Sequence, residues 1–135
     1  TVDRYTVVDD FGNLINPMLA EGQVHGGGGQ GIGQAIQEHV VYDEDGQLLT
    51  ASFMDYAIPR AADVPFVSFN SEPVPSTANL MGMKGCGEAG TVGALAAVSN
   101  AVQDALWERG VRQADMPFTP HKVWALLNDS AIAAE

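Results

Sequence analysis

Glycine constrains this chain more than any other residue, because it weakens helices and strands unless the backbone must pass close to another group. Most of the 15 glycines in the 135 residues fall in two segments. The first covers residues 22–34, and the second, KGCGEAGTVG, covers residues 84–93. Each glycine in a helix interior costs about 1 kcal/mol relative to alanine. A helix through Gly26–Gly33 is therefore expected to form poorly unless something requires its backbone to lie close.

The second segment places a single carboxylate, Glu88, among glycines just before a predicted helix. A carboxylate near a helix N-terminus is stabilised by the helix dipole by about 0.3–1 kcal/mol. Alternatively, the glycines let the backbone approach a ligand closely, and glutamate is a common general base. These residues alone leave both interpretations open.

The same segment fits the dinucleotide-binding pattern G-x-G-x-x-G through Gly85, Gly87 and Gly90. That site requires a buried strand before the loop and an acidic residue about 20 positions later, at the end of a second strand. Residues 79–84 make a weak strand, and Asp104 falls inside the predicted helix. A dinucleotide site is therefore disfavoured.

Three glutamines flank the first segment, namely Gln23, Gln30 and Gln34. An amide side chain both donates and accepts hydrogen bonds, and N–H groups near a helix start attract anions. One interpretation is a binding surface; the other is a solvated polar helix face.

Hydrophobic periodicity and turn residues predict one α+β domain with two or three helices and four or five short strands. The predicted elements are a strand over 4–9, a helical segment from Pro17, a hairpin over 40–50, a strand over 64–69, a helix over 91–109 ending near Gly110, and a short helix capped by Thr119 and opened by Pro120.

Charge and cysteine content exclude several classes of partner and site. The chain has 6 basic and 17 acidic residues, whereas nucleic acids and anionic membranes bind clustered basic residues. No apolar run reaches the ~18 residues of a membrane span. Cys86 is the only cysteine, so no internal disulfide is possible and a cytoplasmic location is expected. The three histidines are far apart in the sequence, which argues against a metal site built from protein side chains.

Several segments together resemble the molybdenum hydroxylases, the large molybdopterin-binding subunits of the xanthine dehydrogenase, aldehyde oxidoreductase and aerobic carbon monoxide dehydrogenase type. The segments are EGQVHGG at 21–27, QGIGQA at 30–35 and KGCGEAGTVGA at 84–94, with shorter matches VDDFG at 8–12, INP at 15–17, MDY at 54–56, ADVP at 62–65, DMPFTP at 115–120 and VW at 123–124. They span nearly the whole chain in the family's order.

The resemblance implies a fold, a reaction and partners. Residues 1–135 would be a single domain or fragment, the C-terminal molybdopterin-binding part of a much longer subunit. The family hydroxylates aldehydes or N-heterocycles with oxygen from water and passes two electrons through molybdenum to iron–sulfur clusters and flavin. The expected partners are the rest of the molybdopterin-binding chain, iron–sulfur and flavin subunits, and a small-molecule substrate.

The resemblance also assigns roles to individual residues. Glu88 matches the family's general base, which takes a proton from a metal-bound hydroxyl. Gln30, Gly31 and Gly33 match a motif near the molybdopterin, and glycines on either side of Cys86, namely Gly85 and Gly87, would let the loop pass close to the cofactor. In this family the pterin dithiolene, and no protein side chain, ligates molybdenum.

Two departures bear on the substrate and on Cys86. The loop after Glu88 differs from the usual carbon monoxide enzymes, which favours an aldehyde- or heterocycle-type relative. Cys86 stands where valine or isoleucine is common, and we interpret it as a small packed residue. Because other segments of the subunit supply much of the pocket, we expect this chain alone to lack the cofactor and to be inactive. The alternative is a non-catalytic remnant that self-associates without cofactor.

Overall fold

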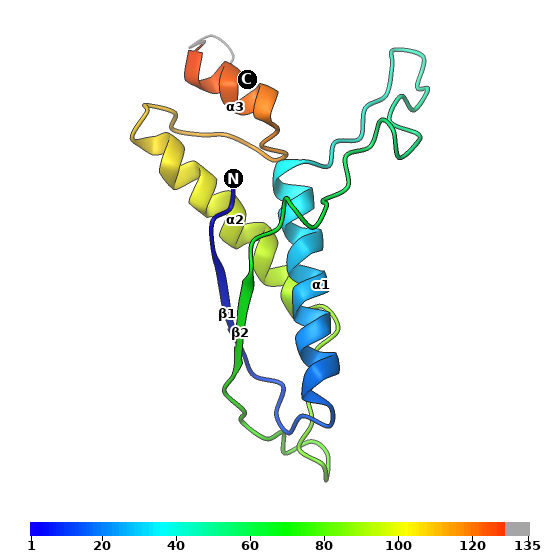
Figure 1. Cartoon of the computed structure of the whole chain (residues 1–135), viewed down its shortest axis with the longest axis vertical. Helices are drawn as coiled ribbons and strands as arrows, with labels where there is room; N and C mark the ends of the chain where they lie inside the picture. Colours follow the sequence, from blue (N-terminus) through cyan, green and yellow to red (C-terminus); the bar gives the residue numbers. More distant parts are fainter. Residues whose placement is uncertain (129–135) are drawn as a thin grey trace.

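The computed structural model describes residues 1–128 and has an α+β architecture (Figure 1). Two strands and three helices occur within these residues: β1 Tyr5–Asp9, α1 Pro17–Ile36, β2 Val67–Ser71, α2 Ala89–Trp107 and α3 Pro120–Asn128. The α+β class predicted from the sequence is confirmed.

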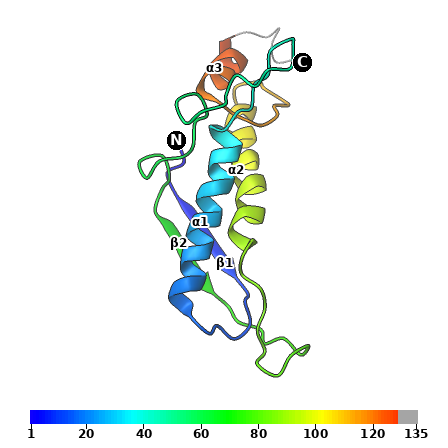
Figure 2. The ribbon, with the colours of Figure 1, turned by 90° about the vertical axis from the view of Figure 1, so that its right-hand side faces the viewer.

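The two strands form a parallel sheet with both long helices on one of its faces (Figure 2). The register runs from Tyr5 opposite Val67 to Asp9 opposite Ser71. Tyr5 and Val67 form a buried cluster with Ala94 of α2. Residues that point to the other face are exposed along both strands. Parallel sheets are normally covered on both faces. Within residues 1–128, by contrast, this sheet is covered on one face only.

α1 runs straight through the first glycine segment because its backbone lies against α2. A Cβ atom on Gly27 would lie 2.7 Å from the Thr91 backbone nitrogen, and one on Gly31 would lie 2.5 Å from the Ala94 Cβ. On α2, a Cβ on Gly90 would lie 2.5 Å from a carbonyl oxygen of α1. The close approach of α1 and α2 is therefore the reason for glycine at these positions, which the sequence alone did not identify.

Several element boundaries differ from the sequence prediction. β2 begins three residues later than the predicted strand over 64–69. The hairpin over 40–50 forms its turn at Gly46, with φ of 82°, but pairs through the single bridge Tyr42–Leu48. The prediction of four or five strands was therefore wrong for residues 1–128, which hold two strands and two isolated bridges. Prolines between 59 and 75 remove donors that further strands would need.

The C-terminal helix begins as predicted. Pro120 is its first residue, and the Thr119 hydroxyl accepts a hydrogen bond from the Lys122 N–H at 3.3 Å. α3 then packs through Leu126 on a buried cluster that includes Leu106 of α2. α3 is thereby joined to the C-terminal end of α2.

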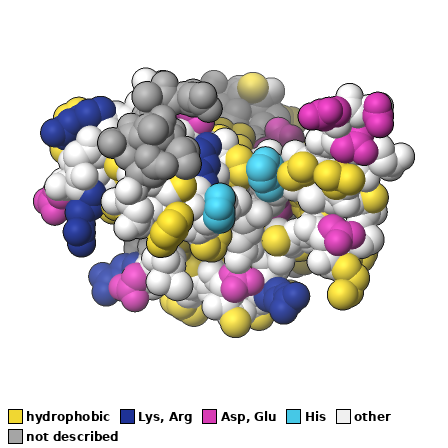
Figure 3. All heavy atoms as spheres, turned by 90° about the horizontal axis from the view of Figure 1, so that it is seen from above, with side chains coloured by type: hydrophobic (Ala, Val, Ile, Leu, Met, Phe, Trp, Pro, Cys, Tyr) yellow, Lys and Arg dark blue, Asp and Glu magenta, His cyan; other side chains and the backbone are white. Residues whose placement is uncertain are grey.

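Part of the segment between α1 and β2 extends away from the body of the molecule as a long arm (Figure 1). Phe53 and Met54 in this arm are 86% and 93% exposed. Seen from the α3 end, hydrophobic side chains reach the surface between the charged ones (Figure 3). Within residues 1–128, each helix is too short or too polar to span a bilayer.

Candidate functional site

Glu88 is the N-cap residue of α2, and its side chain makes no hydrogen bond to the helix start. Its backbone carbonyl accepts the first helical hydrogen bond, from the Val92 N–H at 3.0 Å. The side chain is exposed. The Glu88 carboxylate therefore forms no capping hydrogen bond, and it is accessible to a group outside the described residues.

The loop around Glu88 is packed at some positions and open at others. Cys86 packs against the buried cluster of Phe11, Ala20 and Val24, as expected for a small packed residue. At Gly85 and Gly87, by contrast, an added Cβ would meet no atom within 4 Å. The chain's own packing does not require glycine at these two positions.

Gln30 lies beside the first turn of α2, so the two glycine segments meet. The Thr91 hydroxyl donates a hydrogen bond to the Gln30 side-chain oxygen at 3.2 Å. Both residues are on the helix crossing formed by Gly27 and Gly90. The structure thus brings Gln30 near the helix start that carries Glu88.

The two remaining predicted cofactor-binding residues, Gly31 and Gly33, are buried inside the chain. Gly31 faces Ala94 of α2, whereas a Cβ on Gly33 would lie 2.1 Å from the Pro59 Cγ. Packing within the chain already accounts for glycine at both positions. Their contact with a cofactor stays a prediction.

Asp10 forms contacts that hold the segment before Glu88 in place. The sequence did not reveal this role of Asp10. Its Oδ1 accepts hydrogen bonds from the Gly12 N–H at 2.9 Å and the Val74 N–H at 2.8 Å. Its Oδ2 forms an ion pair with the Lys84 ammonium. The partners lie up to 74 positions away. The local signal was the Asp-Asp turn sequence, which indicates side chain–backbone bonding but not a distant lysine.

These bonds, the one from Lys84 first, lower the pKa of Asp10 from its ordinary value of 3.8 to about 2. A carboxyl group whose pKa is lower in the folded than in the unfolded state stabilises the fold at pH values above its unfolded-state pKa. This stabilisation is lost as the pH falls toward the folded-state pKa of about 2. We therefore expect Asp10→Asn to lower the melting temperature at pH 7, and the difference from wild type to shrink between pH 4 and pH 2. Thermal unfolding followed by circular dichroism checks this, and a difference independent of pH would contradict it.

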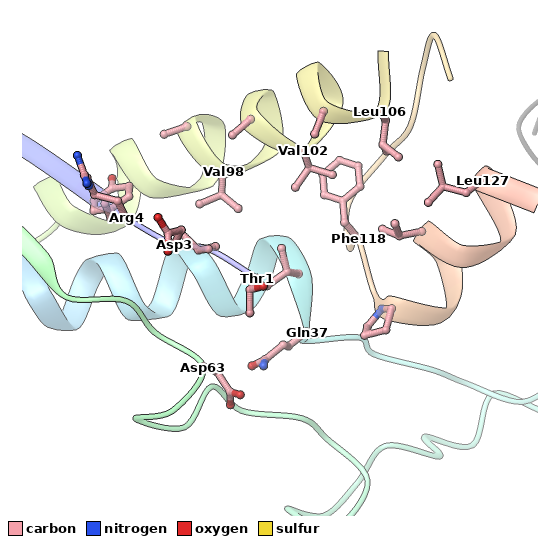
Figure 4. A pocket seen from close by; sticks show the side chains of 18 of the residues that line it. Thr1, Asp3, Arg4, Gln37, Asp63, Val98, Val102, Leu106, Phe118 and Leu127 are labelled. Carbon is pink, nitrogen blue, oxygen red and sulfur yellow. The ribbon is translucent and has the colours of Figure 1, made fainter. Parts of the chain in front are cut away.

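A groove of about 1050 Å³ lies away from Glu88. Figure 4 shows it between the N-terminal residues, the C-terminal half of α2 and α3, with Asp3, Val102 and Phe118 among its walls. A smaller hollow of about 270 Å³ lies beside the loop of interest and is lined by Gln23 and Cys86, among others. Volume alone therefore does not identify the site. Among residues 1–128, no three His, Cys, Asp or Glu side chains gather closely enough to hold a metal ion.

Comparison with known proteins decides the family. Residues 1–65 match the family model described as molybdopterin cofactor-binding domain. The chain is 43% identical to the nicotine 6-hydroxylase large subunit of Paenarthrobacter nicotinovorans, over 90% of this chain and 15% of that protein. It is 37% identical to the carbon monoxide dehydrogenase large chain of Hydrogenophaga pseudoflava, over 98% of this chain and 16% of that protein. The chain belongs to the molybdenum hydroxylase family.

A solved structure of a molybdenum hydroxylase relative has the same fold. Quinoline 2-oxidoreductase from Pseudomonas putida 86 superposes with a TM-score of 0.90 and 41% identity, over 94% of this chain and 16% of that chain. The resemblance noted from the sequence is thus confirmed, as is the fold of part of a molybdopterin-binding domain. The chain spans about one sixth of the length of the molybdenum hydroxylases that it matches.

Proposed function

We propose that this chain supplies the general base and part of the molybdopterin site of an enzyme that hydroxylates an N-heterocycle or an aldehyde. In that reaction a C–H bond and water give a C–OH bond, two electrons and two protons. The observation that carries the proposal is Glu88: an exposed carboxylate at a helix start, unused by the helix, beside glycines that the chain's own packing does not require.

The residues around Glu88 fit a bulky anionic cofactor such as molybdopterin. The open space at Gly85 and Gly87 lets such a group approach the backbone. The N–H groups in the first turn of α2 lie at a helix N-terminus, which favours anions. Gln30 is exposed where α1 crosses this first turn. We propose that Gly85, Gly87 and Gln30 hold the cofactor, together with Gly31 at the helix crossing and Gly33 beside Pro59. When bound, the cofactor would accept the two electrons that leave the substrate.

Glu88 then accepts a proton at its carboxylate as the oxygen nucleophile attacks the substrate carbon. A correctly placed general base contributes about 10²–10⁴-fold to the rate. Its fixed position matters as much as its basicity, because the proton must lie within hydrogen-bonding reach.

The names of the relatives support the proposed substrate class. One relative is named a nicotine 6-hydroxylase and one a quinoline 2-oxidoreductase, and both names refer to N-heterocycles. Their identities of 43% and 41% exceed the 37% and 39% of two carbon monoxide dehydrogenase large chains. We therefore favour an N-heterocycle over carbon monoxide.

The proposed enzyme needs partner chains. Uncovered apolar residues such as Phe53, Met54 and Leu80 support burial against the remainder of the large subunit. The relatives are named as a subunit of a complex and as a large chain, which supports the presence of partner subunits. We propose that these partners carry the iron–sulfur clusters and the flavin. We propose that cofactor binding and activity appear only in the assembly.

Co-expression tests the assembly. We expect this chain, produced with a chain supplying the rest of the large subunit, to co-purify with it and to retain molybdenum and pterin. Molybdenum by mass spectrometry and pterin by fluorescence provide the measurement, with the chain expressed alone as the control. An assembly without either component, or a chain that forms only oligomers of itself, would favour a non-catalytic domain.

A further inference from the structure

The loop that carries Glu88 is fastened to the loop after β1 just upstream of the carboxylate. The Gly82 carbonyl accepts hydrogen bonds from the Asn13 and Ser76 N–H groups, both at 3.0 Å. Gly12 and Met83 form an antiparallel bridge. The contact is so close that a Cβ on Gly12 would lie 2.1 Å from the Gly82 oxygen. Backbone contacts therefore set where the Glu88 loop begins.

Asp10 joins three segments at this junction. Its Oδ1 holds its own turn through Gly12 and the segment after β2 through Val74, while its Oδ2 pairs with Lys84. Lys84 is held twice, because its backbone N–H also donates to the Phe11 carbonyl at 3.0 Å. Lys84 precedes Glu88 by only four residues.

The other end of the loop is fixed by the helix crossing. Gly90 lies against the α1 backbone, where an added Cβ would be 3.0 Å from the Gly28 nitrogen. Between these two anchors the Cys86 side chain packs on the buried cluster of Phe11, but an added Cβ on Gly85 or Gly87 would meet no atom within 4 Å. Glycine is the least restricted residue, so the placement of Glu88 depends on the anchors.

We propose that Asp10 is a positioning residue for Glu88, acting through its ion pair with Lys84 and its bonds to two backbone N–H groups. The inference rests on the proposed function, in which Glu88 is the general base. A base displaced by about 1 Å loses on the order of 10²-fold in rate. Asp10 therefore affects the rate without touching the substrate or the cofactor.

Asp10→Asn and Asp63→Asn form a matched pair of variants. Asparagine at position 10 keeps an oxygen acceptor but removes the charge that Lys84 pairs with. Asp63 also accepts a backbone N–H bond in a turn, from Arg60 at 2.8 Å, and its pKa is lowered by that bond. It borders the large groove, away from the Glu88 loop. Lys84→Met removes the other partner of the ion pair, and Lys84→Arg restores the charge.

The experiment uses the assembled enzyme and two readouts, amide hydrogen exchange of residues 82–88 and steady-state kinetics with matched molybdenum content. We expect Asp10→Asn and Lys84→Met to speed exchange in this loop and to lower kcat by about 10–100-fold with KM nearly unchanged. Lys84→Arg should recover most of the rate, and Asp63→Asn should change neither readout.

Unchanged exchange in Asp10→Asn, or faster exchange with a wild-type kcat, would overturn the positioning role. Glu88→Gln separates this result from a failure of the proposed function. If Glu88→Gln is inactive while Asp10→Asn is fully active, only the positioning role fails. If Glu88→Gln is fully active, the base assignment fails and the positioning role with it.

Discussion

Gly31→Ala is expected to destabilise the fold by about 1–3 kcal/mol, although alanine is the better helix former. The new Cβ would lie 2.5 Å from the Ala94 Cβ and 3.1 Å from the Leu95 nitrogen. Neither atom belongs to a flexible side-chain end, so the two helices would have to move apart. Such movement would also loosen the crossing that places Gln30 beside Thr91.

Gly26→Ala is the matched control, because it makes the same change in the same helix. An added Cβ on Gly26 would meet nothing within 4 Å. We expect this variant to be more stable than wild type by up to about 1 kcal/mol. Urea unfolding of the chain followed by circular dichroism measures both variants. Equal effects of the two substitutions would contradict the account of the helix crossing.

The glycine-rich helix shows where sequence reasoning about the fold stopped. Local propensity indicated a poor helix over Gly26–Gly33, yet α1 continues to Ile36 because α2 packs on its backbone. The starts of α1 and α3 were predictable, since Asn16 and Thr119 are local capping residues. The number of strands was not predictable in the same way, because strand pairing depends on distant partners.

The same distinction between local and distant contacts applies to the candidate site. Glu88 and its glycines stood out because they are adjacent in sequence. The contact between Gln30 and Thr91 joins positions 61 apart, and that between Asp10 and Lys84 joins positions 74 apart. No periodic pattern encodes such pairs, so the fold was needed to find them.

Glu88→Gln is expected to lower kcat of the assembled enzyme by about 10²–10⁴-fold. Glutamine has nearly the same size and still accepts a hydrogen bond, but it cannot take up the proton as a carboxylate does. Because the Glu88 side chain makes no bond to the helix start, its replacement should leave the fold intact. Molybdenum and pterin content should match wild type.

Glu108→Gln is the matched control, the same substitution at an exposed residue at the opposite end of α2. The most direct measurement is the rate of hydroxylated product formation in a single turnover, at equal molybdenum content. We predict that Glu108→Gln reacts at the wild-type rate and that Glu88→Gln reacts at least about 10²-fold more slowly. A molybdenum-loaded Glu88→Gln enzyme that forms product at the wild-type rate would contradict the assignment of Glu88 as the base.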